Sequence, residues 1–410
     1  MSVQDAAVAA QAGTDRAEFE RRLAAVRELM SAEGFDLLIA ADNDSWLLPG
    51  GHVRYLSNFT VGNLAGMAEY SAAIVPLQGE PVLVIPPGPR VCFEAWAEAT
   101  AWIANVRTTP PTGWPPAHNL FDDVVAVVRE NAGGGSRIGM CGTFPGANGL
   151  VAELSDMDVA AAAVVDARGV ARDIVERARE VKSPWEVVRL REAQAYAEES
   201  VKTFMDAVEP GRKQIRAVAE GEWRAKELGA DEAMIIMSSG TAPWVWWIYQ
   251  GERRFSAGDL VSMEGNARVG GYISQLARSG VIGDATPVQQ AVVGTATAAL
   301  EAMIARVAPG ATGGDLWDAA VEVVNEAKLA TWGRFGHGMG LSMAESFDVM
   351  PGDDRPLREG HCIELHAGVI HQESEQSALI GDQYLVQNGK AVPLSEAVLP
   401  FDLAPAFPTG

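Results

Sequence analysis

Hydrophobic and polar positions near the start of the chain follow a helical period and then change to short apolar runs. A stripe at a spacing of three to four residues predicts an amphipathic helix ending at Gly34: Phe19, Leu23, Val26 and Met30. We expect Thr14 or Asp15 to cap the start of this helix, after a disordered lead over residues 1–14. Apolar runs predict buried strands at 35–40, 72–76 and 81–85, and a second helix and strand at 120–130 and 137–140. These elements predict an α/β domain with a mixed sheet over residues 15–175.

A second domain is expected over residues 176–410. Ser183, Pro184 and Glu186 have the spacing of a capping box with proline in the first turn, which predicts the start of a long helix. Further on, helical patterns at 288–307 and 315–329 alternate with β-rich segments at 259–264, 270–282, 361–370 and 378–387. Helices gathered on one side of an antiparallel sheet would make this an α+β domain.

Composition restricts the classes of partner. The 410 residues carry a formal net charge of −22, which disfavours binding to nucleic acid or to an anionic membrane surface. Three scattered cysteines indicate neither a disulfide framework nor a thiolate zinc site. The acidic start has no signal-peptide pattern, and no apolar run is long enough to span a bilayer, so we expect a cytoplasmic protein that acts on a small molecule.

A histidine with glycine on both sides, at residues 336–338, is the clearest candidate for chemistry. Glycine has no Cβ, so backbone and imidazole can approach a ligand closely. Other segments accompany it in a fixed order: 54–59, 182–186, 258–261, 271–272, 278–279 and 309–310. Together these segments resemble the creatinase/aminopeptidase P/prolidase superfamily of "pita-bread" enzymes. The resemblance implies a pita-bread catalytic domain after a smaller creatinase-type α/β domain, an α+β fold overall, and a homodimer.

The metallopeptidase branch of that superfamily holds two divalent cations with two aspartates, a histidine and two glutamates. By the resemblance, those positions fall in this chain on Glu264, Gln275, His337, His366 and Gly381, with Ile380 as the other placement for the last. Two bridged cations need several carboxylates for charge balance, and this set has one. The superfamily's substrate histidine and second loop histidine fall on Trp247 and Ala344. These departures favour neither a two-cation centre nor cleavage of proline peptides.

The main hypothesis is therefore a metal-independent hydrolase similar to creatinase and ectoine hydrolase, without a cofactor. It would act on a non-peptide C–N bond of a small cationic or zwitterionic substrate. Glu264, His337 and His366 would supply the acid and the base that activate water.

Three alternatives remain open at this point. One is a mononuclear enzyme in which Glu264, His337 and His366 hold one iron or zinc ion, with Gln275 completing the set. Another is an inactive small-molecule binding protein of the same fold, in which Glu264 pairs with Arg278. The third is a lyase on the same fold.

Several residues are candidates for substrate contacts. Trp247 stands where the superfamily has its substrate histidine, and Trp244 is close by, so aromatic faces could attract a cation. Gln275 is a polar candidate, and Glu364 lies two residues before His366, hence on the same side of a strand. Arg54 could hold a substrate carboxylate, which by the resemblance would be across a dimer interface.

Overall fold

The chain divides into two compact units, residues 1–179 and 180–410. The computed structural model describes residues 3–43, 50–60, 70–86, 94–108, 120–142, 160–164, 173–240 and 252–394, with side chains from residue 15 onward apart from 160–164. No helix within these ranges is both long and apolar enough to cross a membrane.

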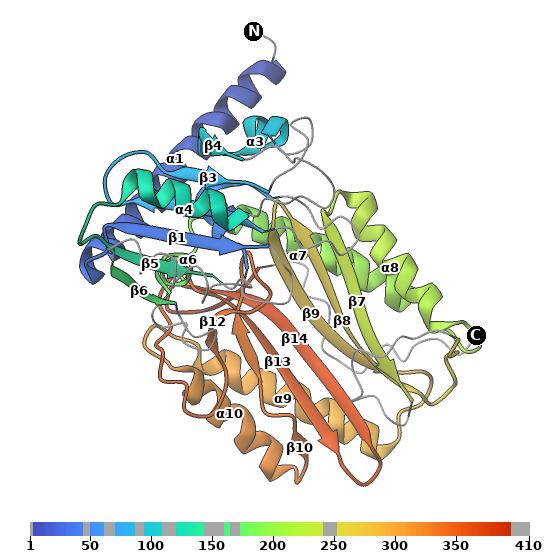
Figure 1. Ribbon diagram of the computed structural model, residues 1–410. Coiled ribbons are helices and arrows are strands. Elements are labelled where there is room, and N and C mark those ends of the chain that lie inside the picture. The colour runs from blue at the N-terminus through green and yellow to red at the C-terminus, as the bar shows by residue number, and fades with distance from the viewer. Residues whose placement is uncertain are drawn as a thin grey trace. The chain divides into compact units, whose positions relative to one another are not determined.

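The amino-terminal unit contains a six-stranded mixed sheet in the order β4-β3-β2-β1-β5-β6 (Figure 1). Its central strand β1 (Leu37–Asp42) is antiparallel to β2 (Ser71–Pro76) and parallel to β5 (Arg137–Cys141), which confirms the mixed sheet. Apolar side chains of α4 (Leu120–Asn131) pack against the sheet. The remaining elements are α2 (His52–Ser57), β3 (Val82–Val84), α3 (Glu94–Thr100), β4 (Asn105–Arg107), β6 (Ala160–Val164) and α6 (Ile174–Arg179).

The first helix is longer than expected. α1 (Val3–Glu33) begins at Val3, so residues 3–14 are helical and the expected disordered lead is wrong for them. Alanine is the strongest helix former, and this segment is rich in it, so propensity here favours extending the helix. The stripe of Phe19, Val26 and Met30 is buried, as the period predicts.

A buried ionic cluster surrounds His52 in the same unit. Its Nε2 lies 3.0 Å from Asp173 Oδ2 and 3.8 Å from Glu176 Oε1, and Arg179 lies 3.3 Å from Nδ1. Burial by itself lowers the pKa of His52, but the charges of Asp173 and Glu176 outweigh burial and raise that pKa to about 9. The same contact lowers the pKa of Asp173 against the opposing effect of burial.

This cluster predicts a loss of stability at alkaline pH. The folded pKa of His52 lies above its ordinary value, so its contribution is fully present below about pH 6.5 and is lost as the pH rises through about 9. We expect the free energy of unfolding to fall by up to about 3 kcal/mol over that window. Chemical denaturation at several pH values would measure this fall, and His52→Gln should flatten it. An equal fall in the variant would contradict the assignment to His52.

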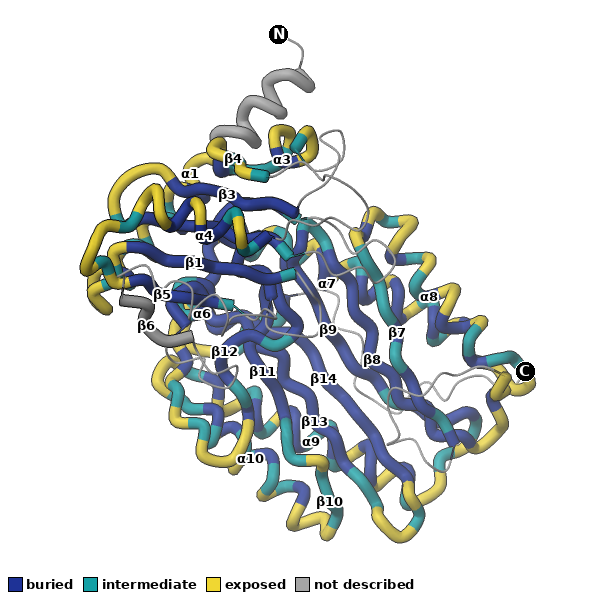
Figure 2. The backbone as a smooth tube through the Cα atoms, in the orientation of Figure 1, coloured by how far each residue is buried: buried dark blue, intermediate teal, exposed yellow. Residues whose placement is uncertain are grey.

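The carboxyl-terminal unit is built on a nine-stranded sheet whose main path is β12-β11-β13-β14-β9-β8-β7. Its long strands are antiparallel to their neighbours, and Figure 2 shows them buried over most of their length. The strands are β7 (Glu232–Ser239), β8 (Leu260–Val269), β9 (Tyr272–Val281), β10 (Ala330–Thr331), β11 (Gly336–Gly338), β12 (Glu345–Asp348), β13 (Cys362–His371), β14 (Gln376–Gln387) and β15 (Lys390–Pro393).

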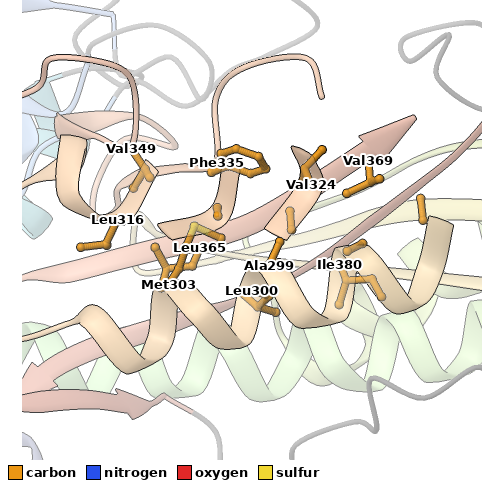
Figure 3. Packing of buried hydrophobic residues seen from close by; sticks show 14 of the residues in the cluster. Ala299, Leu300, Met303, Leu316, Val324, Phe335, Val349, Leu365, Val369 and Ile380 are labelled. Carbon is orange, nitrogen blue, oxygen red and sulfur yellow. The ribbon is translucent and has the colours of Figure 1, made fainter. Parts of the chain in front are cut away.

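Helices cover one face of this sheet. α9 (Pro287–Arg306) and α10 (Gly313–Glu326) form a core with β13 and β14, in which Leu365, Val369 and Ile380 point toward the helices (Figure 3). α7 (Pro184–Asp206) and α8 (Gln214–Leu228) pack against β7, β8 and β9 (Figure 1). α7 begins with the predicted capping box, in which Ser183 accepts from the Glu186 N–H and Glu186 accepts from the Ser183 N–H. The α+β class is confirmed.

Candidate functional site

The sheet face turned away from the helices carries a set of buried polar residues. Side chains alternate between the faces of a strand, and directly paired residues of antiparallel strands share a face. Since Leu365 and Ile380 face the helices, their neighbours Glu364, His366 and Gly381 face the other way. The strand register therefore decides which predicted residues meet.

Two rows cross the sheet on this face. The first, which we call the glutamate row, follows the pairs Glu264–Ala277, Ala277–Gly381 and Gly381–His366 and consists of Glu264, Ala277, Gly381 and His366. The second, which we call the amide row, follows Asn266–Gln275, Gln383–Glu364 and Glu364–His337 and consists of Asn266, Gln275, Gln383, Glu364 and His337. The antiparallel register at Ala277–Gly381 places Gln275 beside Gln383, which joins the two halves of the second row.

The two histidines face each other at one end of the rows. Their ring centroids are 5.4 Å apart with the rings at 64°, and both side chains are buried. Burial and the charge of Arg334 lower the pKa of both, to about 3 for His366. His337 Nδ1 lies 3.1 Å from the Gly338 carbonyl oxygen. Both imidazoles are therefore neutral near pH 7, the form that binds a metal ion or accepts a proton.

Two glutamates lie among these residues. Glu264 accepts a hydrogen bond from Asn266 Nδ2 at 3.2 Å, and burial raises its pKa although hydrogen bonds from Asn266 and Gln275 oppose the shift. Glu364 is fully buried, and burial together with the charges of Asp382 and Glu264 raises its pKa well above the ordinary value. Glu364 lies on the same face of β13 as His366, as its position two residues earlier predicts.

Arg278 does not pair with Glu264. It faces the helices, where its Nη2 lies 3.0 Å from both carboxylate oxygens of Asp382. Arg278 and Glu264 differ in strand parity, so their side chains leave opposite faces of the sheet. The alternative in which Glu264 is a core residue neutralised by Arg278 is therefore wrong.

A buried ion pair fixes the loop that follows His337. Lys182 Nζ lies 2.7 Å from Glu345 Oε2, and Glu345 Oε1 accepts from the Leu341 N–H at 2.8 Å. Burial alone would lower the pKa of Lys182, but Glu345 and Glu186 raise it, so the pair is charged. A Cβ on Gly340 would overlap the Glu345 carboxylate, so the pair also explains this glycine. Sequence reasoning missed the pair, although Lys182 was part of a noted motif.

The structure brings together five of the predicted residues: Glu264, Gln275, His337, Glu364 and His366. Of the two placements for the fifth superfamily position, Gly381 lies on the face of the histidines, because it pairs with His366, whereas Ile380 faces the helices. Arg54 lies on α2 of the amino-terminal unit, and its role across a dimer interface stays a prediction. Trp244 and Trp247 fall outside the described residues. Sequence reasoning missed Asn266 and Gln383, which no local motif marks.

The two-cation centre of the superfamily does not fit these residues. Of the five carried-over positions, only Glu264 is a carboxylate, and Gly381 has no side chain. Within the described part of the chain, no three side chains of histidine, cysteine, aspartate or glutamate are grouped closely enough to hold a metal ion. Two bridged cations would lack the charge and the bridging oxygens they need.

The helix-backed sheet, with its glycine-bracketed histidine on the face turned away from the helices, defines the pita-bread class of domain. Residues 188–388, just under half of the chain, match the model of metallopeptidase family M24, so this part of the chain is similar to that family.

Relatives by sequence have names of peptidases. The "Xaa-Pro dipeptidase" of Pyrococcus furiosus is 24% identical over 48% of this chain, and the match spans 58% of that protein's length. The "Probable dipeptidase PepE" of Mycobacterium bovis is 27% identical over 76% of this chain and 88% of its own length.

Solved structures with similar folds include two peptidases. Dipeptidase PepE from Mycobacterium ulcerans has a TM-score of 0.75 at 23% identity, covering 96% of this chain and 99% of its own. The prolidase from Pyrococcus horikoshii has a TM-score of 0.74 at 20% identity, covering 93% and 99%. At these identities the likeness shows the fold, including the expected smaller amino-terminal domain.

These comparisons correct three expectations. The relatives are dipeptidases and prolidases rather than creatinase or ectoine hydrolase in particular. The hypothesis of a non-peptide C–N substrate is contradicted by those names. The expectation that no cofactor is needed is contradicted by a match to a metallopeptidase family, which implies a divalent metal ion. The ligand count argues against a two-cation centre, but it does not follow that the reaction needs no metal.

Proposed function

We propose that this protein hydrolyses the C–N bond of a peptide link in short peptides, as an enzyme of dipeptidase type. The match of residues 188–388 to metallopeptidase family M24 and the names of the relatives support this class of reaction. The site also suits a small substrate, because its polar residues are buried on the sheet face. A homodimer and a cytoplasmic location stay predictions.

One divalent cation would be held by His337, His366 and Glu264. The observation that carries this assignment is the pair of facing imidazoles: their centroids are 5.4 Å apart, and His366 Nδ1 is buried without a hydrogen-bond partner among the described residues. Two histidines and one carboxylate form a donor set that zinc and iron accept. Glu264 is held by Asn266 in this conformation, so its carboxylate has to turn toward the imidazoles to complete the set.

When bound, such a cation polarises a carbonyl group and lowers the pKa of water. The surrounding residues hold the two histidines in place and shield the site from water. The pair of Lys182 and Glu345 fixes the backbone after His337, and the strand pairing fixes His366 beside it. Every member of both rows is buried, so a substrate bound there would be shielded from bulk water, which strengthens its polar contacts.

The metal requirement gives a direct test. We expect the purified protein to bind one divalent cation per chain, and dialysis against a chelator to remove both the cation and the hydrolysis of Xaa-Pro dipeptides. Adding zinc, manganese or ferrous ion back at one equivalent should restore activity. Elemental analysis and a dipeptide assay measure the two quantities.

Two results would contradict this proposal. Full dipeptidase activity in protein shown to be free of metal would exclude the cation. A requirement for two equivalents would mean that residues outside this set complete a two-cation centre. His371→Ala, on the far end of β13, is a control that should leave the stoichiometry unchanged, because His371 contacts Ser374 rather than the site.

A further inference from the structure

Unused hydrogen-bond acceptors are concentrated in the amide row. Five buried oxygens there have no hydrogen-bond partner among the described residues: Asn266 Oδ1, Gln275 Oε1, Gln383 Oε1, and Oε1 and Oε2 of Glu364. A buried polar atom without a partner is costly, so a cluster of them in one row indicates that something else satisfies them.

The unused atoms must be oxygens, because the amide nitrogens already have acceptors. Asn266 Nδ2 donates to Glu264 Oε1 at 3.2 Å, and Gln383 Nε2 donates to the Ile273 carbonyl at 3.3 Å. A side-chain hydrogen bond also joins Gln275 to the Glu264 carboxylate, which only the amide nitrogen of Gln275 can make. Turning any of these amides would place oxygen against oxygen. The unsatisfied buried atoms of the row are therefore all oxygens, and a ligand that satisfies them has to be a donor.

The space for the Glu364 carboxylate exists because residue 381 is glycine. A Cβ built on Gly381 would lie 2.8 Å from Glu364 Oε1, 2.7 Å from the Leu365 carbonyl oxygen and 2.6 Å from His366 Cβ. No side chain fits at 381, so Glu364 fills that volume from the neighbouring strand. Glu364 is the one carboxylate in a row whose other unused acceptors are neutral amides.

We propose that the amide row is a subsite for a primary ammonium group of the substrate, with Glu364 as its counter-charge. An ammonium has three N–H donors and no acceptor, which matches oxygens from the three adjacent strands that carry Gln275, Gln383 and Glu364. Directly paired side chains on neighbouring strands are about 5 Å apart, so one nitrogen can reach two or three of these oxygens. This inference rests on the proposed function, since the ammonium would belong to the substrate hydrolysed beside the histidines.

Charge selects an ammonium over a divalent cation in this row. A single carboxylate balances one positive charge and leaves a divalent ion undercompensated. Water would also satisfy some of the oxygens, but it is neutral and has two donors where an ammonium group has three. The ammonium group meets both the hydrogen-bond requirement and the charge.

Calorimetry with small probes tests the subsite without relying on turnover. Alaninamide carries the ammonium group, whereas lactamide and N-acetylalaninamide lack it. We expect wild-type protein to bind alaninamide at least about 30-fold more tightly than either, as for other buried charged pairs. Glu364→Gln keeps the shape and removes the charge, so it should abolish the preference. Glu364→Asp should retain part of it.

Matched controls separate this subsite from the metal site and from misfolding. Glu373→Gln changes an exposed glutamate in the turn after β13 and should bind like wild type. Thermal unfolding of Glu364→Gln should occur no lower than in wild type, because the change removes an uncompensated buried carboxylate. Titration with manganese chloride alone reports the cation site.

Two outcomes would overturn the subsite: equal binding of the three probes by wild type, or an unchanged preference in Glu364→Gln. If that variant also lost manganese affinity, Glu364 would hold a metal ion instead. Failure of the proposed function would give a different result. The protein would then hydrolyse no dipeptide with any added divalent cation, while it still bound alaninamide selectively.

Discussion

His337→Ala is expected to lower kcat/KM for an Xaa-Pro dipeptide by more than about 100-fold, because even the outer partners of metal ligands are worth roughly 10–100-fold in affinity or activity. His337 faces His366 across 5.4 Å and is anchored by its strand pairing with Glu364. Alanine there removes one imidazole of the pair and leaves His366 alone to hold the cation. The bound metal per chain should fall well below one equivalent, as measured by elemental analysis.

His371→Ala is the matched control for that prediction. His371 also lies on β13 but contacts Ser374 in the turn that follows, so activity and metal content should stay near wild type. His337→Ala should remain folded, because its imidazole makes one hydrogen-bond contact, with the adjacent backbone carbonyl. A folded His337→Ala protein with wild-type turnover would contradict the site.

Much of the fold could be predicted because local chemistry and tertiary structure agree. The capping box of Ser183 and Glu186 is local, and α7 begins where the sequence places it. β8 continues past its predicted end and β14 begins before its predicted start, since pairing continues through polar positions, whereas β9 and β13 lie within two residues of the predicted runs. The helical start of α1 lies before the apolar stripe, so the hydrophobic period does not mark it, although its alanine content favours a helix.

The site was predictable only where a motif marks a residue. Glu264, Gln275 and His337 follow recognisable spacings, whereas the choice between Gly381 and Ile380 required the register against His366. Asn266 and Gln383 join the site only because four strands align, and sequence does not reveal cross-strand neighbours. The buried ion pair of Lys182 could not be predicted either, because its partner Glu345 is far away in sequence.

The class of reaction could not be predicted from the ligand positions alone. Counting carboxylates at five positions excludes a two-cation centre but says nothing about oxygens that arrive from other strands. Glu364 supplies such oxygens, since its carboxyl group on β13 fills the volume beside Gly381 on the neighbouring strand. The matches to a metallopeptidase family and to an Xaa-Pro dipeptidase instead favour a metal ion and a peptide bond.

Lys182→Met is expected to lower the free energy of unfolding by about 3–5 kcal/mol, the usual cost of leaving one member of a buried ion pair uncompensated. Both side chains are almost fully buried, and their atoms are 2.7 Å apart. The glycine loop should lose order as well, because Glu345 can then take up a proton or move away from the Leu341 N–H that it accepts from. Chemical denaturation measures the first effect, and hydrogen exchange at Leu341 measures the second.

The double variant Lys182→Met, Glu345→Gln should recover much of that loss, since glutamine is neutral and its oxygen can still accept from the Leu341 N–H. Lys202→Met is the matched control: it removes an ion pair with Asp206 whose side chains are 59% and 69% exposed, so we expect a change within about 0.5 kcal/mol. If Lys182→Met were as mild as Lys202→Met, the buried pair could not be what fixes the loop. The recovery in the double variant then separates the charge of Glu345 from its hydrogen bond, because only the charge has been removed.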